Sequence, residues 1–273
     1  MDGRQPRCQS SSRHASVWEA EPPVSVRDAQ VADVPRMAEL AEAKRQRYRD
    51  HAAPFQRPAP NGPAVHEAFL PKLFEWDGFT VLVHETDNGV DGFIVARFGS
   101  APPPYGEGSL FHVDDFALAD GATWPTVGAA LLGEVLVRAE VAGIETAIVV
   151  SGPASVDAPK TAFLAERGLR VDAEWRVKAL TPTTAGKPAK VGFDAAVGPA
   201  PPVYEPGGLT ALALRIDYPE AVERFEHFAA ASDAVVAIVP VRVSDTGLRA
   251  ELDRRGFVVA SEWYAGPVSP LPA

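Results

Sequence analysis

The chain has 273 residues, of which 46% are hydrophobic and 23% charged, a composition typical of an ordinary globular protein. At this length it can bury a core without needing disulfides or a structural metal. Its net charge of −10 argues against a protein that binds nucleic acid through phosphate contacts. No apolar run approaches the ~20 residues that a membrane span needs, so we expect no membrane partner either.

Cysteine usage and the N-terminus bear on the compartment and on metals. Cys8 is the only cysteine, which excludes an intramolecular disulfide and a multi-cysteine zinc site. The histidines show no spacing typical of metal ligands, so we expect no metal. The N-terminus is polar and lacks the apolar stretch of a signal peptide. Together these features favour a cytoplasmic protein.

Prolines divide the chain. Residues 1–23 are polar and read as a disordered tail. Residues 181–208 hold six prolines, and because proline lacks a backbone donor we expect a linker there without helix or central strand. The two boundaries leave a first unit at 24–180 and a smaller second unit at 209–267.

The first unit alternates between strand and helix patterns. Asn88-Gly89 between two β-rich runs is a strong hairpin signal, since both residues tolerate positive φ. The element order predicts a mixed α/β sheet flanked by helices. We expect strands at 24–27, 79–85, 90–98, 109–118, 146–150 and 169–180, and helices at 34–41, 66–76, 127–142 and 157–168.

Two short segments carry a family resemblance. Residues 123–132 read TWPTVGAALL, which resembles the pyrophosphate loop of the GNAT superfamily, the GCN5-related N-acetyltransferases. Residues 166–169 read ERGL and resemble the family's later helix end. The resemblance implies a GNAT-like α/β fold. It also implies an N-acetyltransferase that moves an acetyl group from acetyl-CoA to a primary amine of a small-molecule or peptide acceptor.

The resemblance places coenzyme A at the loop and at the preceding strand. A helix N-terminus carries unpaired N–H groups and partial positive charge, which suits a pyrophosphate. Two alternatives stay open: Gly128 lets its helix pack on the sheet, and strand 109–118 pairs normally with strand 146–150. The implied cofactor-binding residues are Phe116, Ala117, Leu118, Thr123, Thr126, Val127, Gly128 and Ala129.

Three side chains on strand 109–118 are candidates for catalysis. An amine must lose its proton before it attacks a thioester, and a carboxylate or histidine can accept that proton. Asp114 and Asp115 face opposite sides by the two-residue period, so one of them faces a cleft. Apolar neighbours would raise the pKa of that carboxyl group and make it a base. His112 lies on the Asp114 face. The alternatives are a capping or surface role for the acids and a structural role for the histidine.

Departures from the family pattern support an alternative function. Thr123 and Thr126 stand where the loop motif has Arg or Gln and its first glycine. Leu164 stands where many members carry the tyrosine that protonates the leaving thiolate. These residues favour a non-catalytic GNAT-like scaffold or an acyl-CoA-binding sensor.

The second unit repeats part of the first. Residues 254–263 align without a gap on residues 166–175, with five of the ten pairs identical. The repeat predicts that 209–267 is a degenerate C-terminal half of a second GNAT unit; chance similarity of two αβ units is the alternative. Because Asp217 and Glu220 lie where a pyrophosphate would bind, we expect no coenzyme there. We expect this unit to cover a sheet edge, line the acceptor side of the cleft or form a homodimer surface.

Overall fold

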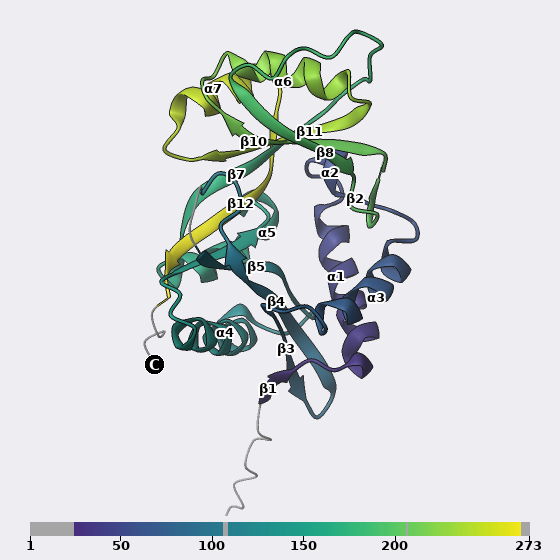
Figure 1. The fold of residues 1–273 in the computed structure, drawn as a ribbon. Coiled ribbons are helices and arrows are strands. Elements are labelled where there is room, and N and C mark those ends of the chain that lie inside the picture. The colour runs from purple at the N-terminus through teal and green to yellow at the C-terminus, as the bar shows by residue number, and fades with distance from the viewer. Residues whose placement is uncertain (1–24, 106–108, 206, 269–273) are drawn as a thin grey trace, which may run out of the picture.

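The computed structural model describes residues 25–105, 109–205 and 207–268 (Figure 1). The tail expected at 1–23 lies outside the described residues. The first unit contains every strand and helix expected from its sequence, and in addition the short elements η1 and η2 and, in the proline-rich loop, α2 and β2. Its elements are β1 (Ser25–Asp28), η1 (Val31–Asp33), α1 (Val34–Tyr48), α2 (Ala53–Gln56), β2 (Arg57–Pro58), α3 (Gly62–Leu73), β3 (Phe79–Thr86), β4 (Gly89–Ser100), β5 (Ser109–Leu118), η2 (Trp124–Gly128), α4 (Ala129–Val141), β6 (Thr146–Ser151), α5 (Ala154–Glu166) and β7 (Arg170–Ala179).

The second unit has the order β-α-β-α-β that the repeat predicts, preceded by two further strands. Residues 181–208, expected to be a linker, contain β8, which pairs with β10 at the end of the sheet. An edge strand pairs on one side only, and the single proline of β8 is its last residue, Pro199, so the strand forms despite its neighbours. The elements are β8 (Phe193–Pro199), β9 (Tyr204–Glu205), β10 (Leu209–Ile216), α6 (Ala221–Ala230), β11 (Ala234–Arg242), α7 (Thr246–Arg254) and β12 (Val258–Pro267).

One mixed sheet of ten strands runs through both units, in the order β1-β3-β4-β5-β6-β12-β7-β11-β10-β8. Strands β5 and β6 pair in parallel, as do β10 and β11, and all other neighbours are antiparallel. Helices α1 and α3 cover one face of β3–β5, and α4 covers the other (Figure 1). The predicted mixed α/β class is therefore confirmed.

The two units exchange their last strands. β12 of the second unit lies between β6 and β7 of the first, and β7 lies between β12 and β11 (Figure 1). The predicted repeat holds in three dimensions, because residues aligned in sequence occupy matching places in these pairings. Gly168 and Gly256, which end the equivalent helices α5 and α7, both adopt positive φ, 80° and 78°.

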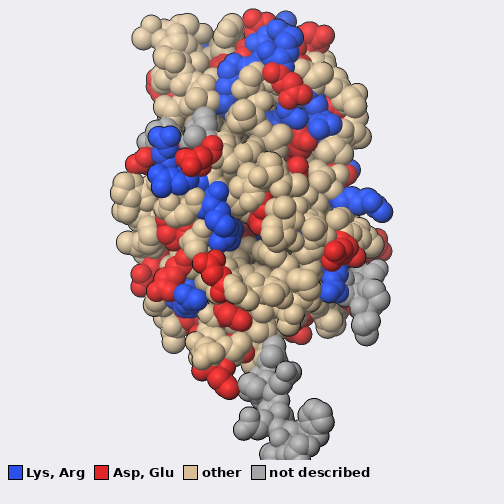
Figure 2. Space-filling model, turned by 180° about the vertical axis from the view of Figure 1, so that it is seen from behind, with Lys and Arg blue, Asp and Glu red and all other residues tan. Residues whose placement is uncertain are grey.

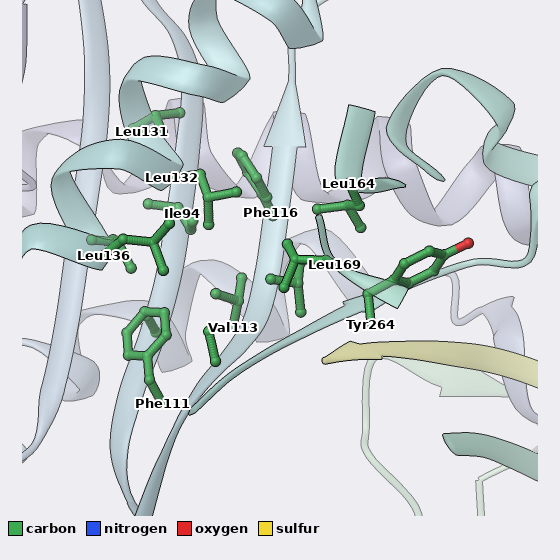
Figure 3. Close-up of a cluster of buried hydrophobic side chains, with 14 of the residues drawn as sticks. Ile94, Phe111, Val113, Phe116, Leu131, Leu132, Leu136, Leu164, Leu169 and Tyr264 are labelled. Atoms are coloured by element: carbon green, nitrogen blue, oxygen red, sulfur yellow. The ribbon is translucent and has the colours of Figure 1, made fainter. Parts of the chain in front are cut away.

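Apolar side chains of α4 and α5 form the main core of the first unit with β4 and β5 (Figure 3). Tyr264 of β12 closes this core from the second unit, so the exchanged strand contributes to the partner unit's interior. Complete burial of a Leu or Phe side chain contributes about 1.5–3 kcal/mol. The residues labelled in the figure are Ile94, Phe111, Val113, Phe116, Leu131, Leu132, Leu136, Leu164, Leu169 and Tyr264.

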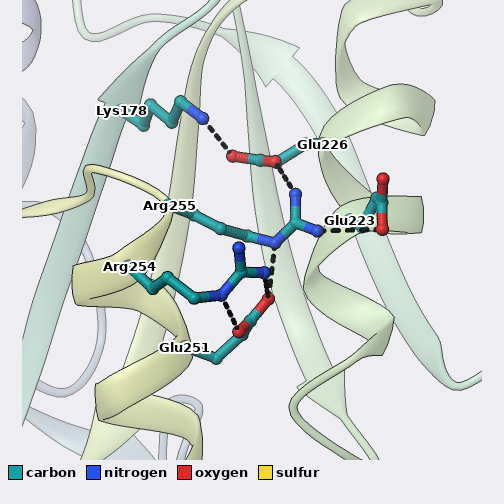
Figure 4. A network of polar contacts seen from close by, with 6 residues as sticks. All are labelled: Lys178, Glu223, Glu226, Glu251, Arg254 and Arg255. Atoms are coloured by element: carbon teal, nitrogen blue, oxygen red, sulfur yellow. Dashed lines mark hydrogen bonds and ion pairs between the residues drawn. The ribbon is translucent and has the colours of Figure 1, made fainter.

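Ion pairs join the second unit's helices to the sheet. Arg255 Nη1 lies 2.7 Å from Glu226 Oε2 of α6, and its Nε lies 2.6 Å from Glu251 Oε1 of α7 (Figure 4). Lys178 Nζ of β7 lies 2.5 Å from Glu226 Oε1. Basic and acidic side chains adjoin one another at this end of the molecule (Figure 2). The network therefore connects β7, α6 and α7.

Candidate functional site

Strand β5 carries a bulge at Asp114. Val113 of β5 pairs with Ala96 of β4, and Asp115 pairs with Val95. Asp114 between them has no partner on β4 and is an extra residue in the register. The extra residue interrupts the alternation of faces. Asp114 and Asp115 therefore both line a cavity on the α1–α3 side of the sheet. The prediction that they face opposite sides is wrong, because period two holds only in an unbroken ladder.

Asp115 is neutralised by a lysine. Its Oδ1 forms an ion pair with Lys44 Nζ of α1. Burial favours the neutral acid, but the charges of Lys44 and His66 outweigh it and hold the pKa of Asp115 below its usual value. The raised pKa expected for a base is therefore wrong for Asp115, which is a poor proton acceptor.

His112 and Asp114 lie within ion-pair distance of each other. His112 Nδ1 lies 2.7 Å from Asp114 Oδ1 and 3.4 Å from Arg97 Nη2, and Arg97 Nε donates to Asp114 Oδ2 at 2.8 Å. With a proton on Nδ1, the imidazole donates to Asp114 and keeps a lone pair on Nε2. His112 is buried, and its Nε2 has no hydrogen-bond partner among the described residues. In this tautomer His112 can act as a base beside a carboxylate.

A cavity of about 240 Å³ lies beside this pair, where the two units meet. Helices α1 and α2 and strands β5 and β6 line it from the first unit. The second unit contributes Tyr204 of β9 and Ser261 and Trp263 of β12. The second unit thus takes part in the wall of the cavity, one of the three roles expected for it.

Several polar atoms on the wall lack partners. Leaving a buried donor or acceptor unpaired costs about 1–3 kcal/mol, so such groups point to a polar ligand or bound water. Five side chains lining the cavity carry a buried polar atom without a partner among the described residues. These atoms are Gln56 Oε1, His112 Nε2, Ser151 Oγ, Trp175 Nε1 and Trp263 Nε1.

Strands β5 and β6 separate next to the cavity. Their pairing covers only 111–113 of β5 and 147–149 of β6, although β5 continues to Leu118. Normal pairing, the alternative considered from the sequence, therefore applies to three residues only. Phe116, Ala117 and Leu118 have no β6 partner, which is the opening that the resemblance implies for the extended arm of coenzyme A.

Lys160 of α5 bridges this opening, and the sequence reasoning missed it. Its Nζ donates to Val150 O at 2.8 Å and lies 3.5 Å from Phe116 O. Burial, and next the charge of Lys44, lower the pKa of Lys160 to about 7. A signal was available: Lys160 lies three and four residues before Phe163 and Leu164, on the buried face of the helix.

The loop that resembles a pyrophosphate site is closed on itself. Residues 124–128 form a π-helical turn, and the N–H groups of Val127 and Gly128 both point to Thr123 O, at 2.9 and 3.3 Å. The Ala129 N–H donates within the same turn. Pro125 has no N–H, and the hydroxyl of Thr123 donates to that of Thr126 at 3.1 Å. Few donors are left for an anion.

Trp124 occupies the space beside Gly128. A Cβ on Gly128 would lie 2.7 Å from Trp124 Cε3, so this glycine makes room for an indole of its own turn and not, as the packing alternative implies, for the sheet. The ring packs on Phe116 and Phe163, with centroids 4.8 and 5.8 Å apart. The neighbouring cavity is lined by Glu166 and by no Lys or Arg. The residues at the loop therefore do not fit a pyrophosphate.

The second unit repeats the site in a simplified form. Tyr218-Pro219 precede α6 where Trp124-Pro125 precede α4. In the aligned helices, Leu248 takes the place of Lys160.

Leu164, at the family's tyrosine position, is fully buried in the first core and has no acid function. Among the described residues, no helix is long and apolar enough to cross a membrane, and no three His, Cys, Asp or Glu side chains are grouped as metal ligands.

Solved structures that are similar to this chain include several acetyltransferases. A tandem GNAT protein from the clavulanic acid biosynthesis pathway is 13% identical over 90% of this chain and 99% of its own, with a TM-score of 0.49. Ribosomal-protein-alanine N-acetyltransferase from Brucella melitensis is 20% identical over 56% and 88%, with a TM-score of 0.43. PaiA N-acetyltransferase from Thermoplasma acidophilum, in complex with coenzyme A, is 14% identical over 55% and 92%, with a TM-score of 0.44.

No family model and no curated protein sequence matches the chain. Its fold rests on its own topology: three antiparallel strands, a β-α-β crossover with separated strands β5 and β6, and a second such crossover that exchanges its last strand with the first. The chain is therefore a mixed α/β fold of two related units, with the element order complete in the first unit and partial in the second.

Proposed function

We propose that the protein is a GNAT-type N-acyltransferase that acylates a primary amine held in the cavity between its two units. The observation that carries this proposal is the His112–Asp114 pair: His112 lines that cavity next to the opening between β5 and β6, and its Nε2 has no partner among the described residues. No other group lining the cavity combines a free basic nitrogen with an orienting carboxylate among the described residues.

The chain's own residues would act on the amine. His112 Nε2 accepts its proton, and Asp114 holds the imidazole in the required tautomer and stabilises the cation that forms. Arg97 Nε donates to Asp114 Oδ2 and so holds this carboxylate beside His112. Asp115 takes no part, because Lys44 already neutralises it. The result is a neutral amine, which is the form that attacks a carbonyl carbon.

Acetyl-CoA is the acyl donor that the resemblance implies. The opening between β5 and β6 favours an extended acyl-bearing arm, whereas the closed turn at 124–128 does not fit the pyrophosphate. A thermal-shift comparison of acetyl-CoA with S-acetylpantetheine tests this division. If the protein binds only the pantetheine arm, acetyl-CoA and S-acetylpantetheine should raise Tm equally. No shift with either ligand at millimolar concentration would contradict the proposed donor site.

The transfer itself is tested by thiol release and product mass with a panel of primary amines. His112→Gln should abolish amine-dependent thiol release while leaving the thermal shift of the donor unchanged. Equal rates for His112→Gln and the wild type would contradict the assignment of the base.

A non-catalytic acyl-CoA sensor is the second candidate. One observation favours it: Leu164, at the position of the family's tyrosine acid, is fully buried in the core and supplies no proton. It predicts a thermal shift with the donor but no thiol release with any amine. Turnover with one amine would exclude it.

A further inference from the structure

We infer that the cavity between the units selects an amine that also carries an aromatic ring and a carboxylate, as an aromatic amino acid does. The inference rests on the proposed function for the amine, whereas the ring and the carboxylate are argued from the cavity wall alone. Four observations carry it: flat aromatic walls, two unpartnered indole donors, one cation without an acid, and the free acceptor on His112.

Aromatic side chains from both units form the apolar part of the wall. The Trp175 and Trp263 rings lie 5.4 Å apart, and Phe55 stacks on Tyr204 at 5.7 Å. Phe55 also lies 6.2 Å from Trp175, so the four rings form one continuous surface. Aromatic rings prefer offset or edge contacts with further rings at such distances. The surface therefore favours a planar, apolar ligand body.

The two indoles supply donors that only an acceptor can satisfy. An indole N–H donates and never accepts. Nε1 of Trp175 and Nε1 of Trp263 are both buried without a partner among the described residues. A ligand made of a ring and an amine alone offers them nothing. A ligand oxygen with several lone pairs, such as that of a carboxylate, can pair with them.

The charges around the cavity leave one cation for that carboxylate. Lys44 is paired with Asp115, and Arg97 with Asp114. Lys160 Nζ contacts the backbone carbonyls of Val150 and Phe116 and lies over the Phe116 and Trp124 rings, and within the described residues no acid lies in ion-pair range. A ligand carboxylate would give this ammonium the counter-ion that its burial requires.

Hydrogen-bond acceptors are available for the amine of the ligand. Gln56 donates through Nε2 to Ala260 O at 2.7 Å, which leaves Oε1 as a free acceptor. His112 Nε2 is the second free acceptor of the wall when Asp114 holds the proton on Nδ1. The cavity volume of about 240 Å³ falls below the ~300–1,000 Å³ usual for ligand pockets, so the ligand is small.

The experiment compares L-phenylalanine with three probes that each lack one of its groups. Phenethylamine lacks the carboxylate, 3-phenylpropionate lacks the amine and L-alanine lacks the ring. Binding is followed by titration calorimetry and by the indole N–H signals in ¹⁵N HSQC spectra. We expect L-phenylalanine to bind at least tenfold more tightly than each of the other three. The signals of Trp175 and Trp263 should move, and that of Trp76, which lies outside the cavity, should not.

Two variants separate hydrogen bonding from packing. Trp263→Phe keeps a ring and removes the donor, and it should weaken L-phenylalanine about tenfold without changing the affinity for phenethylamine. Trp76→Phe is the matched control and should change neither. Equal affinity for L-phenylalanine and phenethylamine, or no binding of any probe at 10 mM, would overturn the inference. Binding as expected without acylation of any amine would leave the inference standing and contradict the proposed transfer instead.

Discussion

Glu174 of β7 and Glu262 of β12 are equivalent residues of the internal repeat, and they pair with each other where the exchanged strands meet. A local two-fold axis therefore passes between them. Their polar partners differ. Glu174 accepts from Arg176 Nε at 2.7 Å and from Arg249 Nη2 at 2.8 Å, whereas Glu262 accepts from Tyr264 Oη at 2.9 Å. The axis relates the backbones but not the charges.

Replacing Glu262 by Gln should raise stability at neutral pH. Burial raises the pKa of Glu262, so the folded state binds more protons than the unfolded state between the ordinary pKa of ~4.3 and the raised value. Stability is thus lost as pH rises through that window. Glu262→Gln should have a higher Tm than the wild type at pH 7, and the difference should vanish near pH 4.

The symmetry supplies a matched control for that variant. Glu174→Gln should lower Tm at pH 7, because Arg176 and Arg249 lose a buried counter-charge. The same substitution at the two equivalent positions should therefore change Tm in opposite directions. Changes of Tm in the same direction would contradict the different roles assigned to Glu174 and Glu262.

Asp114→Asn and Asp115→Asn should differ in kind. Asp114→Asn removes the carboxylate that orients His112, and kcat/KM on a confirmed acceptor should fall about 10²-fold or more with donor binding intact. Asp115→Asn leaves Lys44 buried without its partner, so it should lower Tm while kcat/KM of the folded protein stays near the wild type. Full rate in Asp114→Asn would mean that the base lies elsewhere.

Gly128→Ala should destabilise the protein by about 1–3 kcal/mol, since the new methyl group meets the Trp124 ring. In a Trp124→Leu background the same change should cost less, because the smaller side chain frees the space. Denaturant unfolding of the two single variants and the double variant measures this coupling. Strict additivity would show that the indole is not the cause.

His66 should make the protein sensitive to acid. Burial lowers the pKa of His66 to about 4, so the unfolded state binds more protons between ~6.5 and that value. Stability should fall with decreasing pH across this window, with a slope of at most about 1.4 kcal/mol per pH unit. His66→Leu should flatten the slope, whereas exchange of the exposed His227 for Gln should not.

Residues 209–267 should not fold alone. β12 has its partners β6 and β7 in the first unit, so an isolated fragment would expose both edges of that strand. The fragment should give a collapsed HSQC spectrum. A well-dispersed spectrum would make it an independent domain.

The sequence predicted what depends on local pattern. The hairpin around Asp87-Asn88-Gly89, the alternating runs and the repeat of 166–175 in 254–263 all appear as expected, because turn chemistry and side-chain period act over a few residues. Within the turn, however, only Gly89 adopts positive φ. The bulge at Asp114 was not predictable in this way. Nothing in the alternation marks one added residue, yet that residue decides which side both acids face.

Other features depend on distant parts of the chain. Trp124 fills the space at Gly128 only because Phe116 and Phe163 support it from other elements. The exchange of β7 and β12 joins segments that no local signal connects. Lys160 is the exception, since a lysine in an apolar helical stripe already indicates a buried amine.

The exchanged strand also bears on how the protein is made. Chains are synthesised from the N-terminus, and domains commonly fold as they emerge from the ribosome. Here the edges of β6 and β7 that pair with β12 stay unpaired until β12 has been translated. While residues 180–257 are translated, these two strand edges are open to other chains, so this protein should depend on chaperones during translation more than its size suggests.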